Sequence, residues 1–393
     1  MNVGDNMSVI VGLVNRRHIS LLVAIKKLKP RGVYLIHSGK EYDKDDLSDI
    51  REFLNDMYPD IFVEDRRVNC YSCNEVTSTL EQIAAREKED LVLDLSNGHP
   101  VAMAFLREAS HNKYPVFIFS ERDNRAVIIE KGECRDLQLK EVSFEVEDFI
   151  ESGGGAVYHK STETFDRAEI EDILSWQIGN YSKWLKINRI IKERAIFKTF
   201  GESEQETRVL ADMKNIKPKD KSLILEYIYA LHRFKLIKMD KHNKNNYFLN
   251  FKSMAFKHYA MTYGTWLEAL AYSVIKHLDI MDDVESGVTL FWDKSDTSIV
   301  NEIDVMAVYK GRLVAVSCKD SSRYDEDTLR ELEMEAATLG GSSAIKILVT
   351  TSLPSKKTIE ERAAQMDIRL IIFKGDLNEF CKEFKSVFIQ SQA

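Results

Sequence analysis

The stretch NEIDVMAVYKGRLVAVSCK, residues 301–319, decides the fold of the C-terminal part of the chain. Apolar and β-branched residues flank the Lys-Gly pair at 310–311, a pattern that predicts a β-hairpin with a two-residue turn. That turn fixes the register of the two strands and places Asp304 opposite Ser317. Because side chains alternate between the faces of a strand, the sequence predicts which polar groups share one face of this hairpin.

Acids and a lysine gather on that face near the open end of the hairpin. By the same register, Glu302 faces Lys319, and both lie on the face that carries Asp304. Two carboxylates can bind a divalent cation, and a nearby lysine can orient a water molecule or stabilise developing charge. A surface hairpin with a cross-strand salt bridge is the alternative interpretation of the same residues.

The elements predicted around the hairpin describe an α/β domain. Upstream, a helix that opens at 263–268 carries Glu268 beside its apolar stripe and runs to about His277. Downstream, helices are predicted at 326–339, at 358–366 and from 377 onward, with strands at 345–349 and 368–373. This order predicts a sheet with flanking helices, in which Glu268 can point toward the acids of the hairpin.

This order of an acid on a helix, an acid on a strand and a lysine on the next strand resembles the PD-(D/E)xK nuclease superfamily. The phrases GTWLE at 264–268, NEIDV at 301–305 and SCK at 317–319 are similar to the nuclease domain of the CARF-nuclease effectors of type III CRISPR systems. The resemblance implies a restriction-endonuclease-like α/β domain over residues 256–393. It also implies an enzyme that cuts single-stranded DNA, RNA or both.

The resemblance assigns roles to the residues that match its motifs. Glu268 and Asp304 would hold Mn²⁺ or Mg²⁺, with the backbone carbonyl of Cys318 as a further oxygen ligand. Lys319 would orient or activate the attacking water. These residues form the expected catalytic set, together with the side chain at position 317.

Position 317 is where the chain departs from the superfamily. The superfamily has an acid there and this chain has Ser317, so Glu333 on the following helix is kept as a reserve metal ligand. The departure leaves a second function open. In that alternative, the protein is a ligand-responsive nucleic-acid-binding regulator whose nuclease centre has lapsed.

Composition fits a protein of two or three domains without a membrane span. The chain has 393 residues, a net charge of −8 and five cysteines, an odd number that argues against a disulfide framework and for a cytoplasmic location. No run approaches the roughly 18 apolar residues that a membrane helix needs. The Cys-x-x-Cys at 70–73 has no second ligand pair nearby, so free thiols are favoured over a zinc site.

Residues 1–150 alternate between strand and helix patterns, which predicts a doubly wound, Rossmann-like parallel sheet. The expected strands include 67–71 and 137–142. Ligands of such sheets bind beyond the carboxyl ends of the strands, and the loops there lie at 15–18, 37–39 and 96–100. Neither a GxGxxG nor a P-loop sequence is present, which disfavours dinucleotide dehydrogenases and P-loop enzymes.

This N-terminal unit resembles a CARF domain, the sensor of cyclic oligoadenylates in CRISPR defence. The resemblance implies cyclic tetra-adenylate or cyclic hexa-adenylate as activator, bound across the axis of a homodimer. Helix capping alone is the alternative explanation of His99, which precedes a proline. The loops supply the expected ligand-binding residues: Asn15, Arg16, His18, Ser38, Asn97, Gly98 and His99.

Residues 151–255 are expected to form a hinge and a small connector. Three glycines at 153–155 supply permissive backbone for the hinge. A helix at 223–236 and strands at 237–241 and 247–251 have the shape of a winged-helix fragment, which keeps a regulator with a helix-turn-helix domain in view. Basic and aromatic residues interleave upstream at 183–198, as nucleic-acid contacts or as solvated helix faces.

Overall fold

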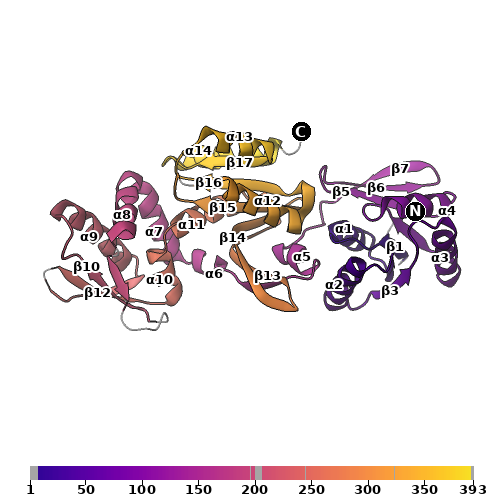
Figure 1. The fold of residues 1–393 in the computed structure, drawn as a ribbon, viewed down its shortest axis with the longest axis horizontal. Coiled ribbons are helices and arrows are strands. Elements are labelled where there is room, and N and C mark those ends of the chain that lie inside the picture. Colours follow the sequence, from indigo (N-terminus) through magenta and orange to yellow (C-terminus); the bar gives the residue numbers. More distant parts are fainter. Residues whose placement is uncertain (1–7, 195, 200–205, 244, 323, 391–393) are drawn as a thin grey trace.

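The computed structural model describes residues 8–194, 196–199, 206–243, 245–322 and 324–390. The chain forms three parts that lie in a row, with the C-terminal domain in the middle (Figure 1). The connector lies between the two larger domains in sequence, but in space it occupies the outer end of the row. Among the described residues, no helix is both long and apolar enough to cross a bilayer.

The N-terminal domain is built on a seven-stranded sheet with the order β3-β2-β1-β4-β5-β6-β7. Its strands are β1 (Val9–Leu13), β2 (Gly32–His37), β3 (Phe62–Arg67), β4 (Leu91–Asp94), β5 (Val116–Ser120), β6 (Arg125–Glu130) and β7 (Glu133–Leu137). The helices between them are α1 (Ile19–Leu28), α2 (Glu41–Met57), α3 (Cys73–Arg86) and α4 (Pro100–Ala109). This confirms the doubly wound α/β fold predicted from the sequence.

Two details of this sheet differ from the prediction, and both concern its edges. Strand β3 lies at 62–67 rather than 67–71, because the edge position requires burial on one side only and tolerates a charged sequence. Strand β7 lies at 133–137 rather than 137–142, and its side chains are largely exposed. Strands β6 and β7 run antiparallel to their neighbours, since the turns that precede them are too short for a parallel crossover.

The C-terminal domain has a mixed six-stranded sheet with the order β17-β16-β15-β14-β13-β8. Its strands are β8 (Ala156–His159), β13 (Asp283–Asp293), β14 (Asp296–Tyr309), β15 (Arg312–Lys319), β16 (Ile345–Thr350) and β17 (Ile368–Ile372). Its helices are α11 (Thr265–Lys276), α12 (Glu326–Gly340), α13 (Lys357–Gln365) and α14 (Leu377–Gln390). The order of elements predicted after residue 263 is confirmed.

The hairpin of β14 and β15 has the predicted register. Tyr309 pairs with Arg312 and Val305 with Val316, so the turn contains only Lys310 and Gly311. Both turn residues have positive φ, 51° and 69°, as the hairpin turns that match strand twist require.

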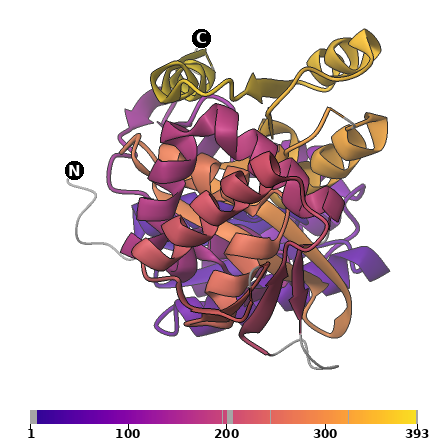
Figure 2. The same ribbon diagram turned by 90° about the vertical axis from the view of Figure 1, so that its left-hand side faces the viewer.

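The connector packs helices against a small sheet with the order β11-β12-β10-β9. Its strands are β9 (Phe197–Thr199), β10 (Arg208–Asp212), β11 (Ile237–Lys241) and β12 (Asn246–Phe251). Its helices are α6 (Thr162–Phe165), α7 (Ala168–Gly179), α8 (Tyr181–Arg194), α9 (Pro218–Arg233) and α10 (Met254–Met261). Viewed along the row, these helices lie in front of the C-terminal domain (Figure 2). The predicted winged-helix fragment, formed here by α9, β11 and β12, is thus part of a larger helical unit.

The segment after the N-terminal sheet joins the two large domains directly. Helix α5 (Val146–Glu151) packs on β13 and β8, and β8 is the edge strand of the C-terminal sheet. Between them, Gly154 has a φ of +86°, and a Cβ there would lie 2.3 Å from an oxygen of Asp49 on α2. The glycines expected to form a hinge therefore lie in a tightly packed junction.

Candidate functional site

The open end of the β14–β15 hairpin brings the predicted acid and lysine together. The backbone N–H of Cys318 donates to Asp304 Oδ2 at 2.5 Å, and the Ser317 hydroxyl donates to the same oxygen at 3.4 Å. Asp304 is largely buried, and burial raises its pKa to about 6 against the lowering effect of the Lys319 ammonium. Position 317 thus supplies a hydroxyl that binds Asp304, and no charge of its own.

Glu268 joins this group from the first turn of α11. Burial, together with the carboxylates of Asp304 and Glu302, raises the pKa of Glu268 to about 8, while Lys319 lowers it. The sequence-predicted residues Glu268, Asp304 and Lys319 therefore share one electrostatic environment. The acids there outnumber the single lysine, which favours binding of an additional cation.

A further acid reaches the same environment from α12, and it is not the one that the sequence suggested. Glu335 is 5% exposed, and burial raises its pKa to about 7, with Asp304 among the charges that act on it. Asn301 Nδ2 donates to Glu335 Oε1 at 3.3 Å. Glu333, by contrast, forms an ion pair with Lys346 on β16.

A pattern in the sequence distinguishes these two acids. The buried stripe of α12 contains Leu329, Leu332, Ala336 and Leu339, and Glu335 lies within it. An acid on the apolar face of an amphipathic helix is an unusual placement that indicates a special partner. Glu333 lies outside this buried stripe, and its carboxylate pairs with Lys346.

The donor set of this site fits a hard divalent cation. Carboxylates from α11, β14 and α12 are oxygen ligands of the kind that Mg²⁺ and Mn²⁺ take in proteins. Burial is the main cause of the raised pKa values of Glu268, Asp304 and Glu335, and the Lys319 ammonium lowers all three. A bound cation would add counter-charge there, so the residues fit a metal.

Asp320 anchors the strand end that carries Lys319. It is 6% exposed, and its Oδ2 accepts from Trp266 Nε1 at 2.8 Å and from Asn188 Nδ2 at 2.7 Å. Its Oδ1 accepts from the Thr351 hydroxyl at 2.8 Å. These bonds tie β15 to α11, to the connector helix α8 and to the end of β16, and so fix the position of Lys319.

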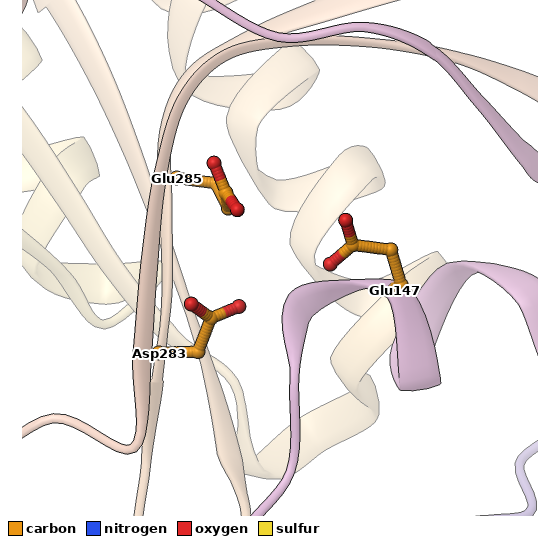
Figure 3. A group of neighbouring side chains, drawn as sticks. All are labelled: Glu147, Asp283 and Glu285. Carbon is orange, nitrogen blue, oxygen red and sulfur yellow. The ribbon is translucent and has the colours of Figure 1, made fainter. Parts of the chain in front are cut away.

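A second acidic cluster lies at the junction of the two large domains. Within the described ranges, Glu147, Asp283 and Glu285 are a group whose potential ligand atoms all lie within 4.8 Å of one another (Figure 3). The Lys160 ammonium, however, pairs with Glu147 and with Glu285, the latter at 2.8 Å. Backbone N–H groups of residues 146 and 284 donate to Asp283, each at 2.8 Å. The Lys160 ammonium and these backbone N–H groups therefore already act as partners of the three carboxylates.

A pocket of about 670 Å³ opens beyond the carboxyl ends of β1, β2 and β4. Several of the predicted ligand-binding residues line it, and these are Asn15, Arg16, Ser38, Gly98 and His99. His99 also caps α4, because its Nδ1 accepts from the backbone N–H of Ala102 at 3.4 Å. The capping interpretation of His99 is thus confirmed, and its contact with a ligand stays a prediction.

The other two predicted ligand-binding residues have different positions. His18 is 3% exposed, and burial lowers its pKa to about 3, so the ring is held neutral inside the domain. Asn97 accepts a bond from the backbone N–H of Gly98 at 3.0 Å and shapes the loop. Neither side chain is among those that line the large pocket.

The sequence did not predict the residues that form one wall of the pocket. Helix α2 contributes acids to it, and the tip of the β13–β14 hairpin contributes Trp292 and Asp293. The acids on α2 are Asp45, Asp46 and Asp49. The C-terminal domain therefore helps to form a pocket that the N-terminal loops alone appeared to define in the sequence.

Known proteins match this chain in two ways, by sequence in its C-terminal part and by fold over nearly its whole length. Residues 257–388 match the family model of the Card1-like endonuclease domain. The structure is similar to that of protein VC1899 from Vibrio cholerae, with a TM-score of 0.76 and 17% identity over 98% of this chain and 99% of that one. No curated protein sequence matches the chain.

Two further structures share the fold and were described with their ligands or activity. Can2 from Sulfobacillus thermosulfidooxidans, solved in complex with cyclic tetra-adenylate, matches with a TM-score of 0.67 and 14% identity over 97% of both chains. A type III CRISPR defence DNA nuclease activated by cyclic oligoadenylate matches with a TM-score of 0.53 and 15% identity. That match covers 92% of this chain and 52% of the other. By sequence, residues 257–388 thus carry a Card1-like endonuclease domain, and over nearly its whole length the chain has the fold of Can2.

Proposed function

We propose that the protein is a divalent-metal-dependent nuclease that a cyclic oligoadenylate activates, and that it cuts single-stranded DNA, RNA or both in CRISPR antiviral defence. The observation that carries the proposal is the joint environment of Glu268, Asp304, Glu335 and Lys319. It lies in the segment that matches the Card1-like endonuclease domain. The fold shared with Can2 supports the link to a nucleotide activator.

The chain's own residues have distinct roles in this proposal. Glu268, Asp304 and Glu335 hold Mn²⁺ or Mg²⁺, with the Cys318 carbonyl as a further ligand. The metal would act as a Lewis acid toward the phosphodiester. Lys319 orients the attacking water and stabilises charge on the phosphate oxygens.

The alternative of a lapsed nuclease rests on Ser317, and Glu335 argues against it. The acid missing from β15 has a counterpart on α12, whose buried carboxylate interacts electrostatically with Asp304 and Lys319. The number of carboxylates is therefore preserved although their positions along the chain are not. A regulator without nuclease activity would not need three poorly compensated acids, which destabilise the fold at neutral pH.

The N-terminal pocket has groups that suit each part of a cyclic oligoadenylate. Arg16 and the N-terminal ends of α1 and α4 favour the phosphates. The acids of α2 can accept bonds from adenine amino groups and ribose hydroxyls. A ligand with two-fold symmetry suits the interface of a homodimer, which we propose as the active assembly.

The test is cleavage of labelled single-stranded DNA and RNA by the purified protein. Cyclic tetra-adenylate, cyclic hexa-adenylate, Mn²⁺ and Mg²⁺ are added or omitted in all combinations. We expect cleavage only when an activator and a metal are both present, and its loss on chelation. Ligand binding without cleavage under every condition would instead support the lapsed-nuclease alternative.

Sensor variants test the assignment of the pocket in the same assay. Arg16→Ala should raise the activator concentration for half-maximal cleavage roughly tenfold, since it removes a charge-assisted phosphate contact. The rate at saturating activator should stay unchanged. Arg135→Ala, on the exposed edge strand β7, is the matched control and should behave as wild type. Equal loss of activity at all activator concentrations would assign Arg16 a structural role.

A further inference from the structure

A chain of hydrogen bonds leads from the wall of the N-terminal pocket to the candidate nuclease centre. Trp292 lines the pocket, and its indole N–H donates to Asn301 Oδ1 at 2.8 Å. Asn301 Nδ2 in turn donates to Glu335 Oε1 at 3.3 Å. Two side chains therefore connect the pocket with a buried acid of the other site.

The chemistry of the partners fixes the orientation of the Asn301 amide. The Trp292 indole can only donate a hydrogen bond, so it requires the amide oxygen of Asn301 as its acceptor. If the amide were rotated by 180°, its oxygen would face Glu335 and its NH₂ group would face the Trp292 N–H. Only the observed orientation satisfies both neighbours, so a displacement of Trp292 alters the group that holds Glu335.

The strand pairing around Trp292 is irregular, and the residues beyond it contact the N-terminal domain. The register of β13 against β14 shifts between Phe291 and Asp293, so Trp292 lies at an irregularity of the ladder. Irregularities such as bulges re-aim side chains and are frequent beside functional sites. Just beyond it, the Lys294 ammonium pairs with Glu52 on α2 at 2.7 Å, and the Lys294 N–H donates to the Gly154 carbonyl at 2.9 Å. The hairpin tip is thus fastened to the N-terminal domain.

We propose that Asn301 is a positioning residue that couples activator binding to the metal site, through Trp292 on one side and Glu335 on the other. The inference rests on the proposed function and specifies how its two sites communicate. A ligand that contacts Trp292 reorients Asn301 and thereby sets the geometry of Glu335. The competing explanation is that these bonds only hold the hairpin in place.

Thermodynamic linkage separates coupling from a structural role. If activator and metal are coupled, Mn²⁺ must change the affinity for cyclic tetra-adenylate by the same factor by which the activator changes the affinity for Mn²⁺. The measurement is calorimetric titration of cyclic tetra-adenylate into the full-length protein, with and without Mn²⁺ and without nucleic acid. The ratio of the two dissociation constants is the coupling factor, and effects of a variant on ligand affinity alone cancel in it.

We expect a coupling factor of at least about fivefold in wild type, within the usual range of such effects. Asn301→Leu, which keeps similar volume but loses both hydrogen bonds, should bring it close to one. Trp292→Phe should do the same, because it retains a ring in the pocket wall and removes only the N–H. The matched control is Trp184→Phe, since the Trp184 N–H has no hydrogen-bond partner among the described residues.

The outcomes distinguish this inference from the proposed function. A wild-type coupling factor near one, or an unchanged factor in Asn301→Leu with only a lower melting temperature, overturns the inference while activator-dependent cleavage can stand. Absence of cyclic tetra-adenylate binding or of metal-dependent cleavage in wild type overturns the proposed function and the inference with it. Loss of the factor in Trp184→Phe as well would show that it responds to general destabilisation, which also overturns the inference.

Discussion

Two acidic clusters in this molecule differ in how their charge is balanced. At the domain junction, Glu147 and Glu285 share the Lys160 ammonium, and their hydrogen bonds raise the pKa of Lys160 although burial opposes this. At the candidate nuclease centre, burial raises the pKa of Glu268 to about 8 and that of Asp304 to about 6.

The difference shows that close spacing of acids does not by itself indicate a metal site. In the junction cluster, whose potential ligand atoms lie within 4.8 Å of one another, Lys160 pairs with Glu147 and Glu285. Backbone N–H groups donate to Asp283, although burial still raises the pKa of that carboxyl. The nuclease acids are spread over α11, β14 and α12 and remain insufficiently compensated. The amount of positive charge near the acids, more than the distance between them, indicates which group can bind a cation.

Removal of Asp304 or Lys319 should have the greatest effect on cleavage. Asp304→Ala and Lys319→Ala should each lower the single-turnover rate by roughly 10²-fold or more, because groups that act in the transition state are lost. Activator binding and dimerisation should be retained. The counterpart at the junction, Glu285→Gln, should cleave at close to the wild-type rate. A reversed pattern would move the chemistry to the junction.

The two acids of α12 should differ in a similar way, with a smaller effect. Glu335→Gln should lower cleavage about tenfold at limiting Mn²⁺, since a carboxylate ligand becomes a neutral amide. Glu333→Gln should remain within about twofold of wild type, because Glu333 pairs with Lys346 and is not among the charges that act on Glu268, Asp304 or Glu335. Metal titrations of the cleavage rate provide the measurement. Equal effects of the two substitutions would contradict the assignment of Glu335.

An acid restored to β15 tests whether its place is already filled. In Ser317→Glu, the new carboxylate would lie beside Asp304, in an environment that Glu335 already makes acidic. Like-charge crowding should then lower activity several-fold. If Ser317→Glu instead lowers the Mn²⁺ requirement or admits Mg²⁺, the wild-type centre has a vacant ligand position and Glu335 does not fill it.

Removal of one acid should change stability in opposite directions at the two clusters, and at Glu268 the change should depend on pH. The raised pKa of Glu268 means that the folded protein holds a proton that the unfolded chain has released, so stability falls as pH rises toward 8. Without metal, Glu268→Gln should therefore melt above wild type at pH 8.5, and the difference should vanish near pH 5. Glu285→Gln should melt below wild type, because it leaves Lys160 short of a partner. Each kcal/mol corresponds to about 2–4 °C in Tm for a domain of this size.

The register of the hairpin at the candidate site was predictable because hairpin geometry is local. Once the turn at Lys310 and Gly311 is recognised, the positions of Asp304 and Ser317 follow by counting. The choice between Glu333 and Glu335 required the helix phase of α12, and only the buried stripe resolves it. The edge strands β3 and β7 were misplaced because half-exposed strands lack a clear apolar pattern.

The N-terminal pocket was predictable only in part, because distant segments complete it. Its loops follow from the order of strands and helices, and Arg16 and His99 line it as expected. Trp292 arrives from the C-terminal domain, and no local signal connects it with the N-terminal loops. His18 is buried and does not line this pocket, and its position in a loop did not reveal this because a polar residue at a loop end can still be buried.

Equilibrium binding of Mn²⁺, counted by electron paramagnetic resonance of the free ion, decides where the protein holds its metal. We expect one tight site per protomer in wild type, retained in Glu285→Gln and lost in Asp304→Ala. Retention of the tight site in Asp304→Ala together with its loss in Glu285→Gln would contradict the account, and would place the metal at the domain junction.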